Sequence, residues 1–247
     1  MISILIDFDN FFSYSSTDDF NWLHTEFNEL INQAFAIDRK TDFISFRLYG
    51  GWMENGLQTN IAFKIQQAIS SFKFFPLFNK AERIFVHGNI ELVTRLISIP
   101  NMEWDDTVRT RLGIPRLRLA GAGLPTGCIG TNESCPVRIL YRFAEKKTKK
   151  CPVGGCPATN ESAFKVVEQK MVDTMLSCDI ISLSEDQRVN GIIVVSDDFD
   201  LLPPIVMAVE NSKKQSKQIV LLKKRLLSAH DTIFGRLESM GLKIMWR

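Results

Sequence analysis

The sequence predicts an α/β fold of three layers, a mostly parallel sheet with helices on both faces. Short apolar runs typical of buried strands alternate along the chain with longer segments whose apolar residues recur at helical spacing. Strands that alternate with helices imply parallel pairing, because each helix carries the chain back across the sheet. The chain has 247 residues, 45% hydrophobic and 23% charged, and can bury a full core, which excludes the disordered and fibrous classes.

The predicted strands and helices follow one another from the N-terminus. Ile2–Asp7 is a continuous apolar run that ends at a carboxylate, which is the pattern of a strand buried on both faces. In Thr17–Ile37 the apolar residues fall on one side of a helix. The other predicted strands are Phe43–Tyr49, Arg83–His87, Gly191–Ser196, Gln218–Leu222 and Leu242–Trp246. The other predicted helices are Gln58–Phe72, Ile90–Ile97, Glu161–Leu183, a helix after Pro203-Pro204, and Leu226–Met240.

The sequence carries no signal for a membrane. No apolar run reaches the roughly 18 residues that a membrane-spanning helix needs. The first residues lack a basic leader and soon meet the carboxylate of Asp7. We therefore expect a soluble, cytoplasmic protein with no membrane partner.

A basic segment interrupts the α/β pattern. Residues 109–150 hold ten Lys and Arg against two Glu, a net charge of +8, which leaves −6 for the rest of a chain whose total is +2. We expect a core formed by residues 1–104 and 160–247, with a small insertion at 105–159. A basic face beside acidic residues suits a polyanion held next to carboxylates. A solvated lysine-rich loop is the alternative.

Four cysteines lie within this insertion: Cys128, Cys135, Cys151 and Cys156. They form a Cys-x6-Cys pair and a Cys-x4-Cys pair fifteen residues apart, which resembles a zinc ribbon. A cytosolic chain keeps its thiols reduced, and four thiolates on two turns can close a tetrahedral zinc site. We therefore expect structural Zn²⁺ here, with unligated thiols in a loop as the alternative. Cys178, in a helical segment, is expected to be a small core residue.

Carboxylates follow two predicted strands at the point where each ends. The first strand leads into Asp7, Asp9 and Asn10, and the fifth leads into Ser196, Asp197, Asp198 and Asp200. Ligands of a parallel sheet bind beyond the carboxyl ends of its strands. Crowded carboxylates repel one another unless a cation binds, and hard oxygen ligands suit Mg²⁺ or Mn²⁺. Any one of these aspartates alone could instead be a turn or helix-cap residue.

A third group of polar residues precedes the fifth strand, on a predicted helix. Lys170 and Asp173 are three residues apart and share a helix face. Asp173 and Asp179 are six apart, so they are turned by about 120° and cannot both point straight at one ion. We favour Asp173 in the metal site, with Asp179 capping, pairing or coordinating through water. A surface Lys/Asp pair is the alternative.

Together these motifs resemble the NYN domain of the PIN-like ribonuclease superfamily. The motifs are Asp7-x-x-Asn10, Lys170-x-x-Asp173-x5-Asp179 and Ser196-x-Asp198-x-Asp200-x-x-Pro203, each after or on the expected element. The resemblance covers residues 1–80 and 160–247. Met171 and Asp197 stand where the family commonly has glycine.

The resemblance implies a metal-dependent endoribonuclease whose partner is RNA. The implied catalytic residues are Asp7, Asn10, Asp173, Asp179, Asp198 and Asp200. Four of these would hold one or two Mg²⁺ or Mn²⁺ ions: Asp7, Asp173, Asp198 and Asp200. Asn10 would orient Asp7 or contact the scissile phosphate. The basic, zinc-bound insertion would hold the RNA backbone, or would recognise a protein partner or a second copy of the chain.

Two alternatives to the nuclease stay open. Asp7 and Asp9 also resemble the nucleophile and the general acid/base of haloacid dehalogenase phosphatases, although Phe11 stands where that family has Thr or Val. A non-catalytic RNA-binding module is the other alternative. Tyr49 and Trp52, after the second strand, would either stack on unpaired bases or pack in the core.

Overall fold

A computed structural model describes residues 1–14, 19–112, 136–144, 150–151, 154–224 and 231–247. The chain forms two compact units. The first unit consists of Met1–Val108 and Gln169–Arg247, and the second of Arg109–Glu168. Within the described ranges, no helix is both long and apolar enough to cross a bilayer.

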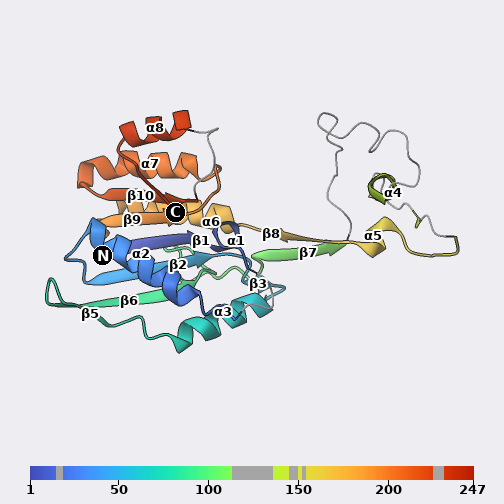
Figure 1. Ribbon diagram of the computed structural model, residues 1–247, viewed down its shortest axis with the longest axis horizontal. Helices are drawn as coiled ribbons and strands as arrows, with labels where there is room; N and C mark the ends of the chain where they lie inside the picture. Colours follow the sequence, from blue (N-terminus) through green and yellow to red (C-terminus); the bar gives the residue numbers. More distant parts are fainter. Residues whose placement is uncertain (15–18, 113–135, 145–149, 152–153, 225–230) are drawn as a thin grey trace. The chain divides into compact units, whose positions relative to one another are not determined.

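The first unit is built on a seven-stranded sheet with the order β11-β10-β9-β1-β2-β6-β5. Figure 1 labels the strands from β10 to β5 in this order. Its strands are β1 (Ile2–Asp7), β2 (Phe43–Tyr49), β5 (Leu77–Asn79), β6 (Ile84–Leu92), β9 (Gly191–Val195), β10 (Gln218–Lys223) and β11 (Lys243–Trp246). All neighbours pair in parallel except β5, which runs antiparallel to β6. The mixed α/β fold with a mostly parallel central sheet is therefore confirmed.

Helices cover both faces of this sheet. One set comprises α1 (Phe8–Phe11), α2 (Leu23–Ile37) and α3 (Asn60–Ser71), and the other comprises α6 (Val172–Glu185), α7 (Leu202–Ser212) and α8 (Asp231–Ser239), with a short 3-10 turn η1 (Lys213–Gln215) after α7. Side chains of β1 alternate between the faces, so Ile4 packs with Phe27 of α2, whereas Leu5 packs with Leu176 of α6. The result is two apolar cores separated by the sheet.

The second unit contains a two-stranded sheet and two short helices. The strands are β7 (Val108–Leu112) and β8 (Lys165–Gln169), and the helices are α4 (Pro136–Ala144) and α5 (Asn160–Ala163). Arg111 pairs with Glu168. A small hairpin of the first unit, β3 (Met53–Glu54) with β4 (Leu57–Gln58), turns at Asn55 and Gly56, both at positive φ.

The sequence prediction was wrong in two segments of the chain. The predicted helix at Ile90–Ile97 is absent, because β6 continues to Leu92 and pairs with β2 up to Leu48. The predicted helix at Glu161–Leu183 is three elements, α5, β8 and α6. The β-branched pair Val166-Val167 favours the intervening strand, and its apolar residues continue the helical spacing and so hide the break. The predicted helices at 17–37 and 226–240 begin at Leu23 and Asp231 in the described residues.

Candidate metal centre

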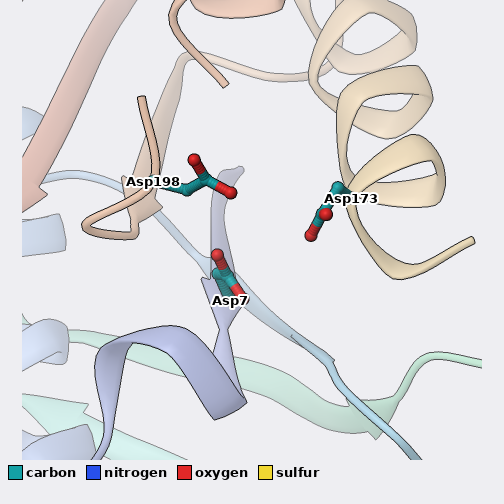
Figure 2. Close-up of side chains that lie close together, drawn as sticks. All are labelled: Asp7, Asp173 and Asp198. Atoms are coloured by element: carbon teal, nitrogen blue, oxygen red, sulfur yellow. The ribbon is translucent and has the colours of Figure 1, made fainter. Parts of the chain in front are cut away.

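Three aspartates from distant parts of the sequence converge at the carboxyl edge of the sheet. Asp7 ends β1, Asp173 lies in the first turn of α6, and Asp198 follows β9. One carboxylate oxygen from each lies within 4.8 Å of the other two. Figure 2 shows the three carboxylates turned toward a common space. We call this group the aspartate triad.

The sheet register explains why these residues meet. β1 and β9 are parallel neighbours in which Ile6 pairs with Val195, so the residues after both strands emerge side by side. The helix α6 packs against β1, and its N-terminal end carries Asp173. Peptide dipoles at a helix N-terminus favour a negative charge. Met171, the residue before α6, adopts a left-handed conformation (φ 64°), which turns the chain from β8 into the helix.

Asp7 is the buried member of the triad, with 1% of its surface exposed. Its Oδ2 accepts a hydrogen bond from the Ser196 hydroxyl at 2.7 Å. Its Oδ1 has no hydrogen-bond partner among the described residues. Burial, together with the charges of Asp173 and Asp198, raises the pKa of Asp7 from 3.8 to about 6, against the lowering effect of Ser196. A buried carboxylate oxygen without a partner is costly, and a cation would satisfy it.

Backbone and hydroxyl groups orient Asp198. The Ser196 hydroxyl that donates to Asp7 also accepts the Asp198 N–H at 3.0 Å. Asp198 Oδ1 accepts the N–H of Asp200 at 2.9 Å. Burial raises the pKa of Asp173, and the charges of Asp198 and Asp200 raise it further. The carboxylates of the triad thus repel one another in the absence of a cation.

Two further predicted residues, Asp200 and Asn10, lie outside the triad. Asp200 is exposed, but its charge raises the pKa of Asp173, so it is within electrostatic reach. Asn10 is exposed on α1, the helix that directly follows Asp7.

Asp179 takes part in a separate buried network. Its carboxylate accepts hydrogen bonds from the Tyr49 hydroxyl (2.7 Å) and the Ile97 N–H (2.9 Å), and it lies 3.0 Å from Arg47 Nη2. Burial raises the pKa of Asp179 and Arg47 lowers it. Arg47 also pairs with Glu91 at 2.8 Å. Of the roles considered for Asp179, the one observed is pairing.

The two aromatic residues after β2 are not available for stacking. Tyr49 is fully buried, and its hydroxyl donates to Asp179. Trp52 is 1% exposed, and its indole N–H donates to the Leu48 carbonyl at 2.7 Å. The expectation that they pack in the core is confirmed, and the stacking alternative is wrong.

Asp9 is held by several donors. Its Oδ2 accepts the Gly51 N–H at 2.8 Å and the side-chain amide of Gln169, and its Oδ1 accepts the Tyr14 hydroxyl. Burial raises the pKa of Asp9, whereas the Gly51 hydrogen bond lowers it.

Lys223 is a residue of this centre that sequence reasoning missed. It ends β10 and is fully buried. Its Nζ lies 3.4 Å from the Ser196 carbonyl oxygen and 4.7 Å from the centre of the Phe199 ring. Burial lowers the pKa of Lys223, and the nearby charges of Asp197, Asp198 and Asp7 raise it. The signal in the sequence is an apolar strand that closes on a lysine, beside strands that close on aspartates.

The structure describes two of the four predicted zinc ligands. Cys128 and Cys135 lie outside the described residues. Cys151 and Cys156 are partly exposed on either side of a turn in which Gly155 has a positive φ. The N–H of Cys151 donates to the Ala158 carbonyl at 2.8 Å. Cys178 is exposed on α6, so the expectation of a core position for it was wrong.

Comparisons with known proteins do not identify a family or a function for this chain. No family model, no curated protein and no solved structure matches the chain. Three carboxylates that share one space can bind a hard divalent cation, which in turn can bind and polarise an anionic substrate.

Proposed function

We propose that the protein is a metal-dependent endoribonuclease of the NYN group in the PIN-like superfamily. The observation that carries the proposal is the aspartate triad at the carboxyl edge of a parallel sheet. Its three residues belong to the three motifs on which the resemblance rests. The arrangement of the strands around it, β9-β1-β2, leaves the carboxyl ends of two central strands beside the N-terminus of α6.

The donor set fits a divalent cation. Each member of the triad offers a carboxylate oxygen, and such hard ligands suit Mg²⁺ or Mn²⁺. The unpartnered Oδ1 of Asp7 would gain the cation as a partner, and the mutual repulsion that raises the pKa of Asp7 and Asp173 would be relieved. We propose Asp7, Asp173 and Asp198 as direct ligands, with Asp200 close enough to contribute.

The residues around the triad would prepare it for phosphodiester hydrolysis. A bound ion would supply a more acidic water and neutralise charge on the phosphate. Ser196 fixes the carboxylate of Asp7, and the N–H of Asp200 fixes that of Asp198. Lys223 interacts electrostatically with Asp7 and Asp198, and a positive charge there would limit repulsion among the carboxylates of the triad. Asn10, exposed on the adjacent helix α1, is proposed to contact the scissile phosphate.

The basic second unit is proposed to bind the RNA backbone. Residues 109–150 carry the net charge of +8. Binding of phosphates by Lys and Arg releases counterions and needs no sequence specificity. We propose that Cys128, Cys135, Cys151 and Cys156 hold Zn²⁺ and so fold this unit. A protein partner or a second copy of the chain would be a further use of the same surface.

The surroundings of Asp9 favour the nuclease over a phosphatase. A general acid must release and take up a proton at the substrate. The carboxylate of Asp9 is instead engaged by Gly51, Tyr14 and Gln169. An Asp9→Asn variant separates the two functions: a phosphatase would lose its activity, whereas the nuclease would keep most of its own.

The test is cleavage of labelled RNA by the purified protein. Single-stranded and structured RNA are incubated with Mn²⁺, Mg²⁺ or EDTA. We expect cleavage that requires the cation and is lost in Asp198→Asn, since this change removes a ligand without altering the size of the side chain. Retention of the wild-type circular dichroism spectrum shows that the variant is folded.

Two outcomes would overturn the proposal. One is cleavage by Asp198→Asn or Asp7→Asn at the wild-type rate. The other is the absence of cleavage by folded wild-type protein that calorimetry shows to be saturated with Mn²⁺. RNA binding in EDTA without cleavage in any metal would favour the non-catalytic module.

A further inference from the structure

A hollow of about 880 Å³ opens near the ends of β10 and β11. Lys224 and Arg247, which directly follow these strands, line it together with Phe11, Phe12 and Trp22. The remaining lining residues are Ser13 and two carboxylates, Asp19 and Glu26. Its volume falls within the range of roughly 300–1,000 Å³ that is usual for small-molecule sites. None of these residues belongs to the aspartate triad. We call this space the tryptophan hollow.

Trp22 is held in place by other aromatic rings. Its ring centre lies 4.9 Å from that of Phe12 and 6.2 Å from that of Phe8, with which it stacks. The side chain is nevertheless only half-buried, and it lines the hollow. An indole supported on one side by a rigid cluster offers its remaining surface to a flat ligand at little cost in conformational entropy.

Lys224 supplies the positive charge of the hollow. Its Nζ lies 5.2 Å from the centre of the Phe11 ring. Among the described residues no carboxylate pairs with this ammonium group. The other cation, Arg247, is paired with Glu26 and, at 3.1 Å, with Glu29. Of the two carboxylates in the lining, Glu26 is paired with Arg247, and Asp19 accepts hydrogen bonds from the backbone N–H and the side-chain amide of Asn21. The hollow therefore combines an aromatic platform with one ammonium group that pairs with neither carboxylate and can bind an anion.

Residues of the hollow lie next to residues of the triad along the chain or are hydrogen-bonded to their neighbours. The backbone N–H of Lys224 donates to Asp197 Oδ1 at 2.8 Å, and Asp197 directly precedes Asp198. Phe11 ends α1, the helix that begins directly after Asp7. A nucleic acid strand with one phosphate at the triad would thus have its neighbouring nucleotides near the hollow.

We propose that the tryptophan hollow binds one unpaired nucleotide of single-stranded RNA, with the base against Trp22 and a phosphate on Lys224. This inference rests on the proposed nuclease function, for which it specifies a single-stranded substrate. Bases within a duplex are stacked on their neighbours, so an aromatic platform selects unpaired ones. Stacking tolerates every base, which predicts weak sequence preference.

The test measures binding of a short RNA oligonucleotide in EDTA, where no metal-dependent cleavage occurs. Trp22→Leu is compared with wild type, each with an oligonucleotide series in which one residue at a time is abasic. Stacking of a base on an aromatic side chain predicts that Trp22→Leu weakens binding roughly 5-fold to 150-fold. An abasic residue at one position should weaken wild-type binding similarly and leave Trp22→Leu unaffected.

Control variants distinguish loss of the proposed nucleotide site from a general effect of removing an aromatic ring or a charge. Phe63→Leu removes an exposed aromatic ring on α3 and should bind RNA as wild type does. Lys224→Gln should reduce the dependence of log K on log salt by about 0.7, the value for one phosphate contact of a single strand. If Trp22→Leu does not fold, Trp22→Phe with the abasic series and Lys224→Gln still test the proposal.

The outcomes distinguish this inference from the proposed function. If wild type cleaves RNA, and Trp22→Leu binds RNA as tightly as Phe63→Leu does, the proposed nucleotide site in the hollow is overturned. The proposed nuclease function would then remain. RNA binding that depends on Trp22, without cleavage in any metal, would support the proposed nucleotide site and overturn the proposed nuclease function. A nucleoside monophosphate that binds as tightly as the oligonucleotide would show that the hollow binds a free nucleotide. This result would overturn the proposal that the hollow binds a nucleotide of an RNA strand.

Discussion

Asp7 is the residue of the centre whose ionisation is strongly opposed by burial and by neighbouring negative charges. Its surroundings raise its pKa from 3.8 to about 6, chiefly through burial. The folded protein therefore binds this proton more tightly than the unfolded chain does. The stability that protonation provides is present at low pH and is lost as the pH rises from about 4 to about 6.

We predict that Asp7→Asn removes this pH dependence in the metal-free protein. The shift corresponds to about 2 kcal/mol of unfolding free energy lost by wild type between pH 4 and pH 7. Urea denaturation in EDTA at several pH values measures it. Glu238→Gln, at an exposed position of α8, is the control and should follow wild type. Equal pH profiles for Asp7→Asn and wild type would contradict the prediction.

Met171 is a second residue whose conformation carries a cost. It has φ 64° at the start of α6, where side chains other than Gly are strained. We predict that Met171→Gly raises the unfolding free energy by about 0.5–1 kcal/mol, because glycine adopts this conformation readily. Met171→Ala keeps the strain and should not be more stable than wild type. Chemical denaturation of the three proteins compares them.

The helix α6 gives two aspartates different environments. Asp173 belongs to the triad and is exposed, whereas Asp179 is fully buried against Arg47 and Tyr49. We predict that Asp179→Ala lowers the unfolding free energy by about 3–5 kcal/mol, because it leaves the Arg47 charge buried without this partner.

Asp173→Asn on the same helix should lower stability little and abolish cleavage. Denaturation and RNA cleavage, measured on both variants, separate the structural role from the proposed ligand role. A stable Asp179→Ala protein without activity would instead place Asp179 in the reaction.

The end of strand β10 brings Lys223 within electrostatic reach of Asp7 and Asp198, and the next residue, Lys224, lines the tryptophan hollow. We predict that Lys223→Met strengthens Mn²⁺ binding roughly tenfold, since it removes a positive charge that repels the ion across a poorly hydrated space. Lys224→Met, at the neighbouring position, should bind Mn²⁺ as wild type does. Isothermal titration calorimetry measures both. Unchanged Mn²⁺ affinity in Lys223→Met would show that Lys223 does not act on the centre.

Sequence periodicity predicted the strands that form the centre, but not every element around them. β1 has the predicted bounds, and β9 ends one residue before the predicted Ser196. β10 continues one residue beyond the predicted end at Leu222, to Lys223. The extension of β6 to Leu92 depends on pairing with β2, which no local pattern encodes. Spacing on α6 excluded a common direction for Asp173 and Asp179. The aromatic surroundings of Lys223 come from Phe199 and Phe234, which only the tertiary fold brings to it.

The division of the chain into two units separates the aspartate triad from the proposed zinc site and its basic surface. All three triad residues belong to the unit formed by Met1–Val108 and Gln169–Arg247. The predicted zinc ligands Cys151 and Cys156 belong to the other unit. Changes to the zinc site should therefore leave the centre intact.

We predict that purified protein contains one Zn²⁺ per chain and that Cys151→Ser loses it. The variant should bind RNA more weakly, because the metal contributes to folding of the basic unit. It should hydrolyse a small phosphodiester, bis(p-nitrophenyl) phosphate, at the wild-type rate with Mn²⁺. Metal analysis and the two assays measure these effects. Wild-type protein without zinc would contradict the prediction.

The strand order has a consequence for the protein during its own synthesis. β1 is made first, yet its neighbour β9 and the residue Asp198 come some 190 residues later along the chain. A nascent chain that has not yet reached residue 198 has Asp7 but not Asp198, so the three carboxylates cannot meet until most of the 247 residues have been made. An activity that depends on the triad would thus be absent during most of the protein's own synthesis.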